Sequence, residues 1–250
     1  MTVSRSLRSL PIVLPTDQLE GHAPVAFERA ARSATAGDAT HLGLITIAST
    51  LTRFTLAGAA PPSARRPILD ALDVLERWRG GGESEHSVKR ARSDAFAAAP
   101  SVEQRTVEAV AGSLGSRKQH TAIDAHADSV VLRFVGLGAY YAVSACILAL
   151  DGASDPAALV AIPRQAAGAL AYQQAGLGLA RSQVMRARAL EQAGWEAERP
   201  GAPAGHGEEA LAIQLFHEFL GAYWKDHSDA QRAYFADFIH WALPARLSAN

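Results

Sequence analysis

The chain has 250 residues, of which 48% are hydrophobic and 20% charged, and its formal net charge is −1. This composition is typical of a folded globular protein and excludes an intrinsically disordered chain. The small net charge provides no field that would draw the protein to nucleic acid or to an anionic bilayer, so we expect neither as a partner. Cys146 is the single cysteine, so no disulfide can form within the chain. Together with the lack of a signal-peptide pattern, this predicts a cytoplasmic protein.

Helical periodicity dominates the first half of the chain. The β-branched residues between Thr46 and Thr52 also favour a strand, but the length of their segment and its lack of alternation favour a helix. Pro67 is expected in the first turn of its helix, and Pro100 is expected to separate two helices. The predicted helices cover 25–34, 39–57, 65–78, 84–99 with Ser84 or Ser87 as the N-cap, and 101–114.

The most apolar part of the chain predicts a long helical hairpin. Its members cover 125–150 and 156–191, and Asp155 is a suitable N-cap for the second member. Each member contains Gly-Leu-Gly, at Gly136–Gly138 and at Gly176–Gly178. Because glycine costs a helix about 1 kcal/mol relative to alanine, we expect these glycines where helices approach closely.

The end of the chain predicts a second, smaller helical hairpin. A proline- and glycine-rich linker at 198–207 precedes two aromatic-rich helices at 208–224 and 229–243. The predicted fold is therefore all-α, a multi-helix bundle or array with a long central apolar hairpin and a C-terminal helix pair. The expected domains are 1–199 and 200–250, with a single domain left open.

One segment of the hairpin raises the alternative of a membrane span. Phe134 to Leu150 is uncharged over about 17 residues, at the lower limit of what crosses a bilayer. Its many small residues, and the lack of a basic flank opposite Arg133, favour a buried central helix instead. We therefore expect no membrane partner.

Metal-binding patterns are weak. Glu83 and His86 match Glu-x-x-His once, but a carboxylate-bridged two-metal bundle needs a second copy, so the match is attributed to chance. A metal-dependent helical enzyme remains an alternative, although solvated polar helix faces explain its candidate ligands more simply. Those candidates are His217, Glu218, Asp237 and His240.

Motifs of nucleophilic catalysis and nucleotide binding are missing from the sequence. There is no Gly-x-Ser-x-Gly, and no glycine-rich phosphate loop follows a predicted strand, so we expect no cofactor. Cys146 lies in an apolar helix, which disfavours a thiolate and predicts a buried structural thiol. These observations favour a binding protein over an enzyme.

Surface residues offer the best candidates for function. Aromatic rings with flanking charges suit protein interfaces, where they provide a large contact area at low entropic cost. A scaffold that self-associates through its Gly-Leu-Gly faces is a further alternative, so a homo-oligomer is left open. The candidate binding residues are Glu83, Glu85, Arg90, Arg92, Trp224 and Tyr234.

From Arg65 to about Ala180, the order of elements resembles the alanine-rich helical immunity proteins of bacterial toxin systems. The likeness is carried by Leu-Glu-Arg-Trp-Arg-Gly at Leu75–Gly80, by the arginine- and alanine-rich helix Val88–Ala99, and by the hairpin with its small residues. The chain departs from the histidine-rich repeats of such families, since the hairpin has no histidine after His126. The resemblance implies a cytoplasmic protein that binds and neutralises a cognate toxin, and it transfers no binding residue.

Overall fold

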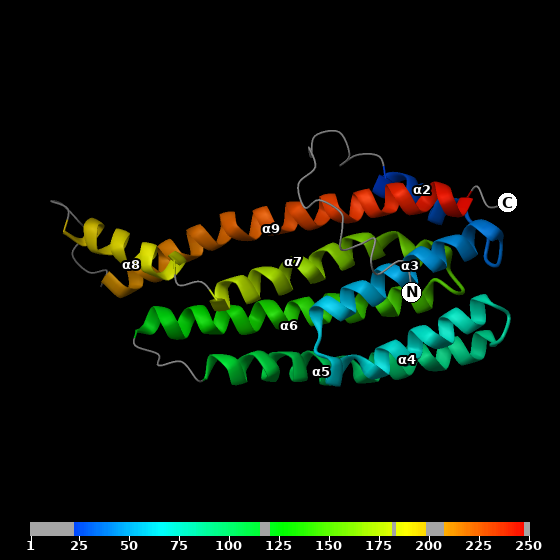
Figure 1. The fold of residues 1–250 in the computed structure, drawn as a ribbon, viewed down its shortest axis with the longest axis horizontal. Coiled ribbons are helices and arrows are strands. Elements are labelled where there is room, and N and C mark those ends of the chain that lie inside the picture. Colours follow the sequence, from blue (N-terminus) through cyan, green and yellow to red (C-terminus); the bar gives the residue numbers. More distant parts are fainter. Residues whose placement is uncertain (1–22, 116–120, 182–183, 199–207, 248–250) are drawn as a thin grey trace.

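The fold is known from a computed structural model, which describes residues 23–115, 121–181, 184–198 and 208–247. Those residues form eight α-helices, one short 3-10 helix and no strand, so the all-α prediction is confirmed. Long helices lie side by side in one layer, each antiparallel to the next (Figure 1). In spatial order they are α5 (Glu85–Leu114), α6 (Ala122–Asp151), α7 (Ile162–Arg181) and α9 (Glu208–Leu247).

The other helices cover the two ends of this layer (Figure 1). At one end, α3 (Ala39–Ala59) packs on α6 and α7, and α4 (Pro62–Arg79) packs on α5. There α2 (Ala23–Ser33) contacts α9 and the 3-10 helix η1 (Pro156–Ala161). At the other end, α8 (Val184–Ala197) packs on α9.

Two clusters of buried side chains form the core. The larger cluster joins α2, α3 and α4 to the layer and includes Phe27, Leu51 and Leu72. The smaller cluster joins the first half of α6 to α8 and α9, and includes Ile123 and Phe216. Each end of the layer therefore has its own hydrophobic core.

Helix α3 forms despite its β-branched residues, as predicted. The Asp38 carboxylate accepts a hydrogen bond from the His41 backbone N–H at 2.6 Å, which caps the helix. The hydroxyls of Thr46, Thr50 and Thr52 each donate to the carbonyl four residues earlier, at 2.8 to 3.0 Å. Threonine hydroxyls are therefore satisfied inside the helix, and burial outweighs the intrinsic preference for a strand.

The predicted position of Pro67 is wrong, because α4 begins at Pro62 and Pro67 lies inside the helix. A proline in a helix interior has no N–H for the carbonyl four residues earlier, which here belongs to Ser63. That carbonyl accepts a hydrogen bond from Nη1 of Arg105 on α5 at 3.2 Å. A tertiary hydrogen bond thus replaces the one that the proline removes.

The break predicted at Pro100 is also wrong, because α5 runs through it without interruption. The side chains that α5 buries keep helical spacing on both sides of the proline, with Val88 and Ala95 before it and Val102 and Thr106 after it. Packing of this one face holds the helix together across a residue that would end an exposed helix. The N-cap prediction is confirmed for Ser84, whose hydroxyl accepts from the Ser87 N–H at 3.2 Å.

The helix predicted over 156–191 consists of several elements. Asp155 caps its start as predicted, by accepting from the Ala157 N–H at 3.0 Å. The 3-10 helix η1 comes first and leads into α7, and α8 begins at Val184. The prediction of one long second member is therefore wrong.

The predicted C-terminal helix pair is wrong as well, because α9 is one helix of 40 residues. The expected turn at 225–228 lies within it. Lys225 and Asp229, which would have flanked that turn, form an ion pair one helical turn apart at 3.7 Å. The sequence contains no glycine or proline between Gly221 and Pro244 that would end a helix. The predicted linker falls almost entirely outside the described residues.

The glycines of the two Gly-Leu-Gly segments lie at close helix contacts, as predicted. A Cβ on Gly138 of α6 would lie 3.0 Å from the Ala169 carbonyl oxygen of α7. A Cβ on Gly176 of α7 would lie 3.0 Å from a methyl of Val135 on α6. Both close approaches are contacts between α6 and α7 of the same chain.

Replacing Gly138 by alanine should therefore destabilise the protein. The added methyl would lie 3.0 Å from the Ala169 carbonyl oxygen and 3.2 Å from the Gln173 backbone nitrogen, and overpacking of this kind costs about 1 to 3 kcal/mol. Gly168, on the neighbouring helix α7, has open space where a Cβ would lie, with no atom in its way within 4 Å. Gly168→Ala should instead stabilise by about 0.5 to 1 kcal/mol through helix propensity. Urea unfolding measures both, and equal effects of the two substitutions would contradict the close packing.

Candidate functional site

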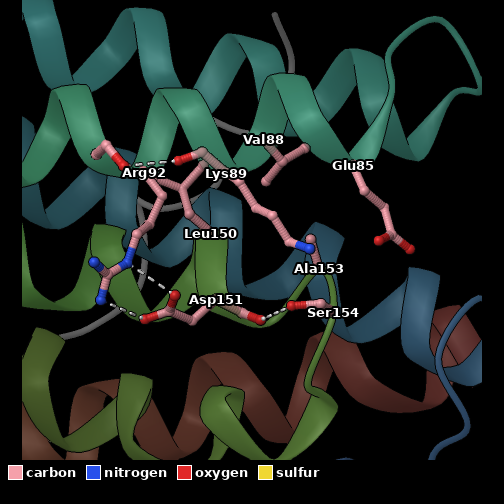
Figure 2. Close-up of a pocket in the computed structure, with 9 residues that line it drawn as sticks. Glu85, Val88, Lys89, Arg92, Leu150, Asp151, Ala153 and Ser154 are labelled. Carbon is pink, nitrogen blue, oxygen red and sulfur yellow. Dashed lines mark hydrogen bonds and ion pairs between the residues drawn. The ribbon is translucent and has the colours of Figure 1, made fainter.

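A hollow in the described part of the chain lies between the first half of α5 and the end of α6. We call it the α5–α6 groove, and Figure 2 shows its side chains converging from the two helices. Its volume is ≈ 310 Å³. The lining residues are Glu85, Val88, Lys89, Arg92, Ser93, Leu150, Asp151, Ala153 and Ser154.

The groove has an apolar floor and a charged rim. Val88, Leu150 and Ala153 are buried, each no more than 4% exposed. Glu85, Lys89 and Arg92 recur at three- and four-residue spacing, which places them on one face of α5. The rim therefore presents both signs of charge above an apolar base, the arrangement found where a protein partner inserts a side chain.

An ion pair closes one side of the groove. Nε of Arg92 lies 3.0 Å from Oδ1 of Asp151, and Nη2 lies 3.4 Å from Oδ2, so the two planar groups meet side by side. The guanidinium also lies over the ring of Phe96, 5.7 Å from its centre, and Phe96 is 62% exposed. An aromatic ring, a guanidinium and a carboxylate thus lie together at the surface.

His41 fixes the end of α6 that forms one wall of the groove. Its imidazole is fully buried, and Nδ1 accepts from the Gly37 N–H at 2.8 Å. Nε2 therefore carries the proton and donates to the Gly152 carbonyl at 2.6 Å. Gly152 stands between Asp151 and Ala153, so the buried ring holds the position of the groove wall.

The chemistry of the groove suits binding. Its two hydroxyls are engaged with the backbone, since Ser93 donates to the Lys89 carbonyl at 3.1 Å and Ser154 donates to the Asp151 carbonyl at 3.4 Å. Asp151 is engaged with Arg92, and the Lys89 and Glu85 side chains complete the charged lining. The groove offers charged and apolar contacts.

The structure brings together some of the predicted binding residues. Glu85 and Arg92 both line the groove, whereas Arg90 is exposed on α5 outside it. Glu83 lies in the turn before α5, and its carboxylate pairs with Arg77 at 3.2 Å. A hydrogen bond from Ser87, and then the Arg77 guanidinium, hold the pKa of the Glu83 carboxyl below its ordinary value. Lys89 and Asp151 belong to the site but were missed.

Trp224, another predicted binding residue, is part of a run of aromatic rings across three helices. Tyr140 and Tyr141 of α6 meet edge to face, Tyr141 stacks on Tyr172 of α7, and Tyr172 stacks on Trp224 of α9 at 4.0 Å between ring centres. Tyr140 is 54% exposed, and the other three rings are half-buried. The side chain of Tyr234 lies outside the described residues.

Of the four predicted metal ligands, the structure describes the side chains of two. His217 and Glu218 are exposed on α9, and the side chains of Asp237 and His240 lie outside the described part of the chain. No group of three or more histidine, cysteine, aspartate or glutamate side chains is arranged to hold a metal among the described residues. His217 instead faces His126 of α6, a pairing that no pattern in the sequence indicates.

Two predictions concern apolar segments: a buried structural thiol at Cys146, and a buried central helix in place of a membrane span. Cys146 is completely buried, and burial raises the pKa of its thiol to about 12, so the predicted structural thiol is confirmed. Among the described helices, α3 and α6 are long and apolar enough to cross a membrane by length and composition alone. About half of each such segment is buried (56% and 50%), and the core helices of soluble proteins pass the same test.

Comparison with known proteins adds no relative. No family model, no curated protein and no solved structure matches this chain.

Proposed function

We propose that this chain is a non-enzymatic binding protein that neutralises a cognate bacterial toxin, and that it holds the toxin at the α5–α6 groove. The observation that carries the proposal is the groove itself. It combines a buried apolar floor with a rim of both charges, and the exposed Phe96 lies outside its lining, against the Arg92 guanidinium. Interfaces of tight protein complexes have this combination of arginine and aromatic anchors around a desolvated pocket.

The location of the groove supports the toxin-binding part of the proposal. The segments that carry the resemblance to immunity proteins are Leu75–Gly80 and Val88–Ala99. The first is the end of α4 and the turn after it, and the second supplies Val88, Lys89, Arg92 and Ser93 to the groove. The resemblance and the groove thus coincide on the same part of the chain.

A cell-based experiment tests this function. The reading frame beside the gene is expressed from an inducible promoter, with and without this chain. We expect the neighbouring product to arrest growth alone, growth to be restored by co-expression, and the two proteins to co-purify. Growth arrest that persists despite a soluble, folded chain, with no complex, would refute the proposal.

A further inference from the structure

Away from the groove, two histidines from distant parts of the sequence face each other. His126 lies on the first half of α6, and His217 lies on α9, 91 positions later in the chain. Their Nε2 atoms are 2.8 Å apart and share a hydrogen bond in which one ring donates to the other, and their ring centres are 4.8 Å apart. The nitrogens that most often bind metals therefore point toward one another.

The pair is held in place by the core on one side and open to water on the other. The ring of Phe216, which is fully buried, meets the His126 ring edge to face at 6.1 Å. His126 is half-buried, and His217 is exposed. One imidazole is thus fixed by packing, and the other leaves room for water molecules.

We propose that a divalent transition-metal ion binds between Nε2 of His126 and Nε2 of His217 and so links α6 to α9. With metal–nitrogen bonds of about 2.0 to 2.1 Å, two adjacent ligands of a square-planar ion lie about 2.9 Å apart. For a tetrahedral ion the same separation is about 3.3 Å. The observed 2.8 Å matches the first separation and is shorter than the second, and in both cases the rings tilt so that their lone pairs meet at the ion.

The donor atoms define the class of ion. Imidazole suits copper, nickel and zinc, and affinity for a given site rises from nickel to copper and falls again at zinc. With no third ligand of the usual kinds arranged beside them in the described residues, water completes the coordination. The ring that now donates the hydrogen bond binds the metal as its other tautomer, with the proton on Nδ1 and the Nε2 lone pair free.

Metal binding at this position stabilises the folded chain. The two ligands come from helices that are joined only through the folded structure, so the unfolded chain holds no equivalent site. When free metal exceeds the dissociation constant a hundredfold, the folding equilibrium constant rises about a hundredfold. The stabilisation is greatest for the end of the layer where α6, α8 and α9 meet.

The experiment uses the full chain after treatment with a chelator, with Cu²⁺ and Zn²⁺ as probes. Equilibrium dialysis should show Cu²⁺ bound more tightly by the wild type than by His217→Ala, and Zn²⁺ bound more weakly than Cu²⁺. Electron paramagnetic resonance of the copper complex should show two nitrogen ligands. Saturating Cu²⁺ should raise the urea midpoint of the wild type and leave that of His217→Ala unchanged.

His86→Ala is the matched control, since His86 is exposed on α5 and its loss leaves the facing pair intact. It should bind copper like the wild type. His126→Ala should lose copper binding, as His217→Ala does. If His126→Ala folds poorly, His217→Ala still tests the proposal, because His217 is exposed and its replacement should leave the fold intact. Equal copper affinity in the wild type and His217→Ala, or a spectrum with one nitrogen ligand, would overturn the proposal.

Discussion

Asp128→Ala should lower the free energy of unfolding by about 3 kcal/mol or more, the largest effect on stability that we expect. Nη2 of Arg186 on α8 lies 3.0 Å from Oδ1 of Asp128 on α6, and the side chains of both residues are only 8% exposed. Removing the Asp128 carboxylate leaves the positive charge of Arg186 buried without its closest negative partner. The remaining partner is Asp124, which is more exposed and 3.3 Å away.

Two further variants separate charge from packing. The double substitution Asp128→Leu with Arg186→Met should recover most of the lost stability, because apolar residues replace a buried ion pair at little cost. Asp70→Ala removes an exposed ion pair with Arg66 and should leave stability nearly unchanged. Urea unfolding of all three measures the difference. If Asp128→Ala behaved like Asp70→Ala, the charges at the α6–α8 contact would not be buried as described.

On the proposed function, Arg92→Glu should weaken binding of the cognate toxin by about thirtyfold or more, which corresponds to about 2 kcal/mol. The substitution reverses the charge beside the exposed Phe96 and repels Asp151 across the groove. Because the Arg92–Asp151 pair is itself 41% and 38% exposed, the fold should tolerate its loss. The effect should therefore appear in the affinity for the product of the neighbouring reading frame, measured by titration calorimetry.

Arg90→Glu is the matched control, since it makes the same charge change two residues earlier on the same helix but outside the groove. Its affinity should remain close to that of the wild type. Ser154→Trp should block binding without a change of charge, because Ser154 is exposed at the groove wall. Equal losses from Arg92→Glu and Arg90→Glu would indicate a general electrostatic effect and contradict docking in the groove.

Local signals in the sequence predicted local structure well. The caps at Ser84 and Asp155 were predictable because a side chain there bonds to an N–H only two or three residues away. The close approach at Gly138 and Gly176 was predictable because glycine in a long helix needs a packing reason. In these cases the residue itself carries the information.

The failures occurred where distant contacts decide the local structure. Pro67 and Pro100 are accommodated because α4 and α5 pack against each other and, at Pro67, because Arg105 serves the freed carbonyl. The charged residues around Lys225 resembled a turn, although they continue a helix. Whether a proline or a charged segment ends a helix can be predicted correctly only when the neighbouring helices are known.

The candidate site was half predicted for the same reason. Glu85 and Arg92 were selected because exposed charges near a turn are common in interfaces. Their partner Asp151 lies 59 positions after Arg92, and the facing histidines are 91 positions apart. No spacing rule in a single sequence joins such residues, so the groove and the histidine pair emerge only from the fold.

The proposed docking of a toxin in the groove is tested most directly by a photo-crosslinking residue placed at Ser154 in cells that express the chain and the neighbouring reading frame. The same residue at Gly112, exposed on the far half of α5, is the control. We predict a covalent adduct with the toxin from position 154 and none from position 112. An adduct from position 112 alone, or from neither position in cells that the chain protects, would contradict binding at the groove.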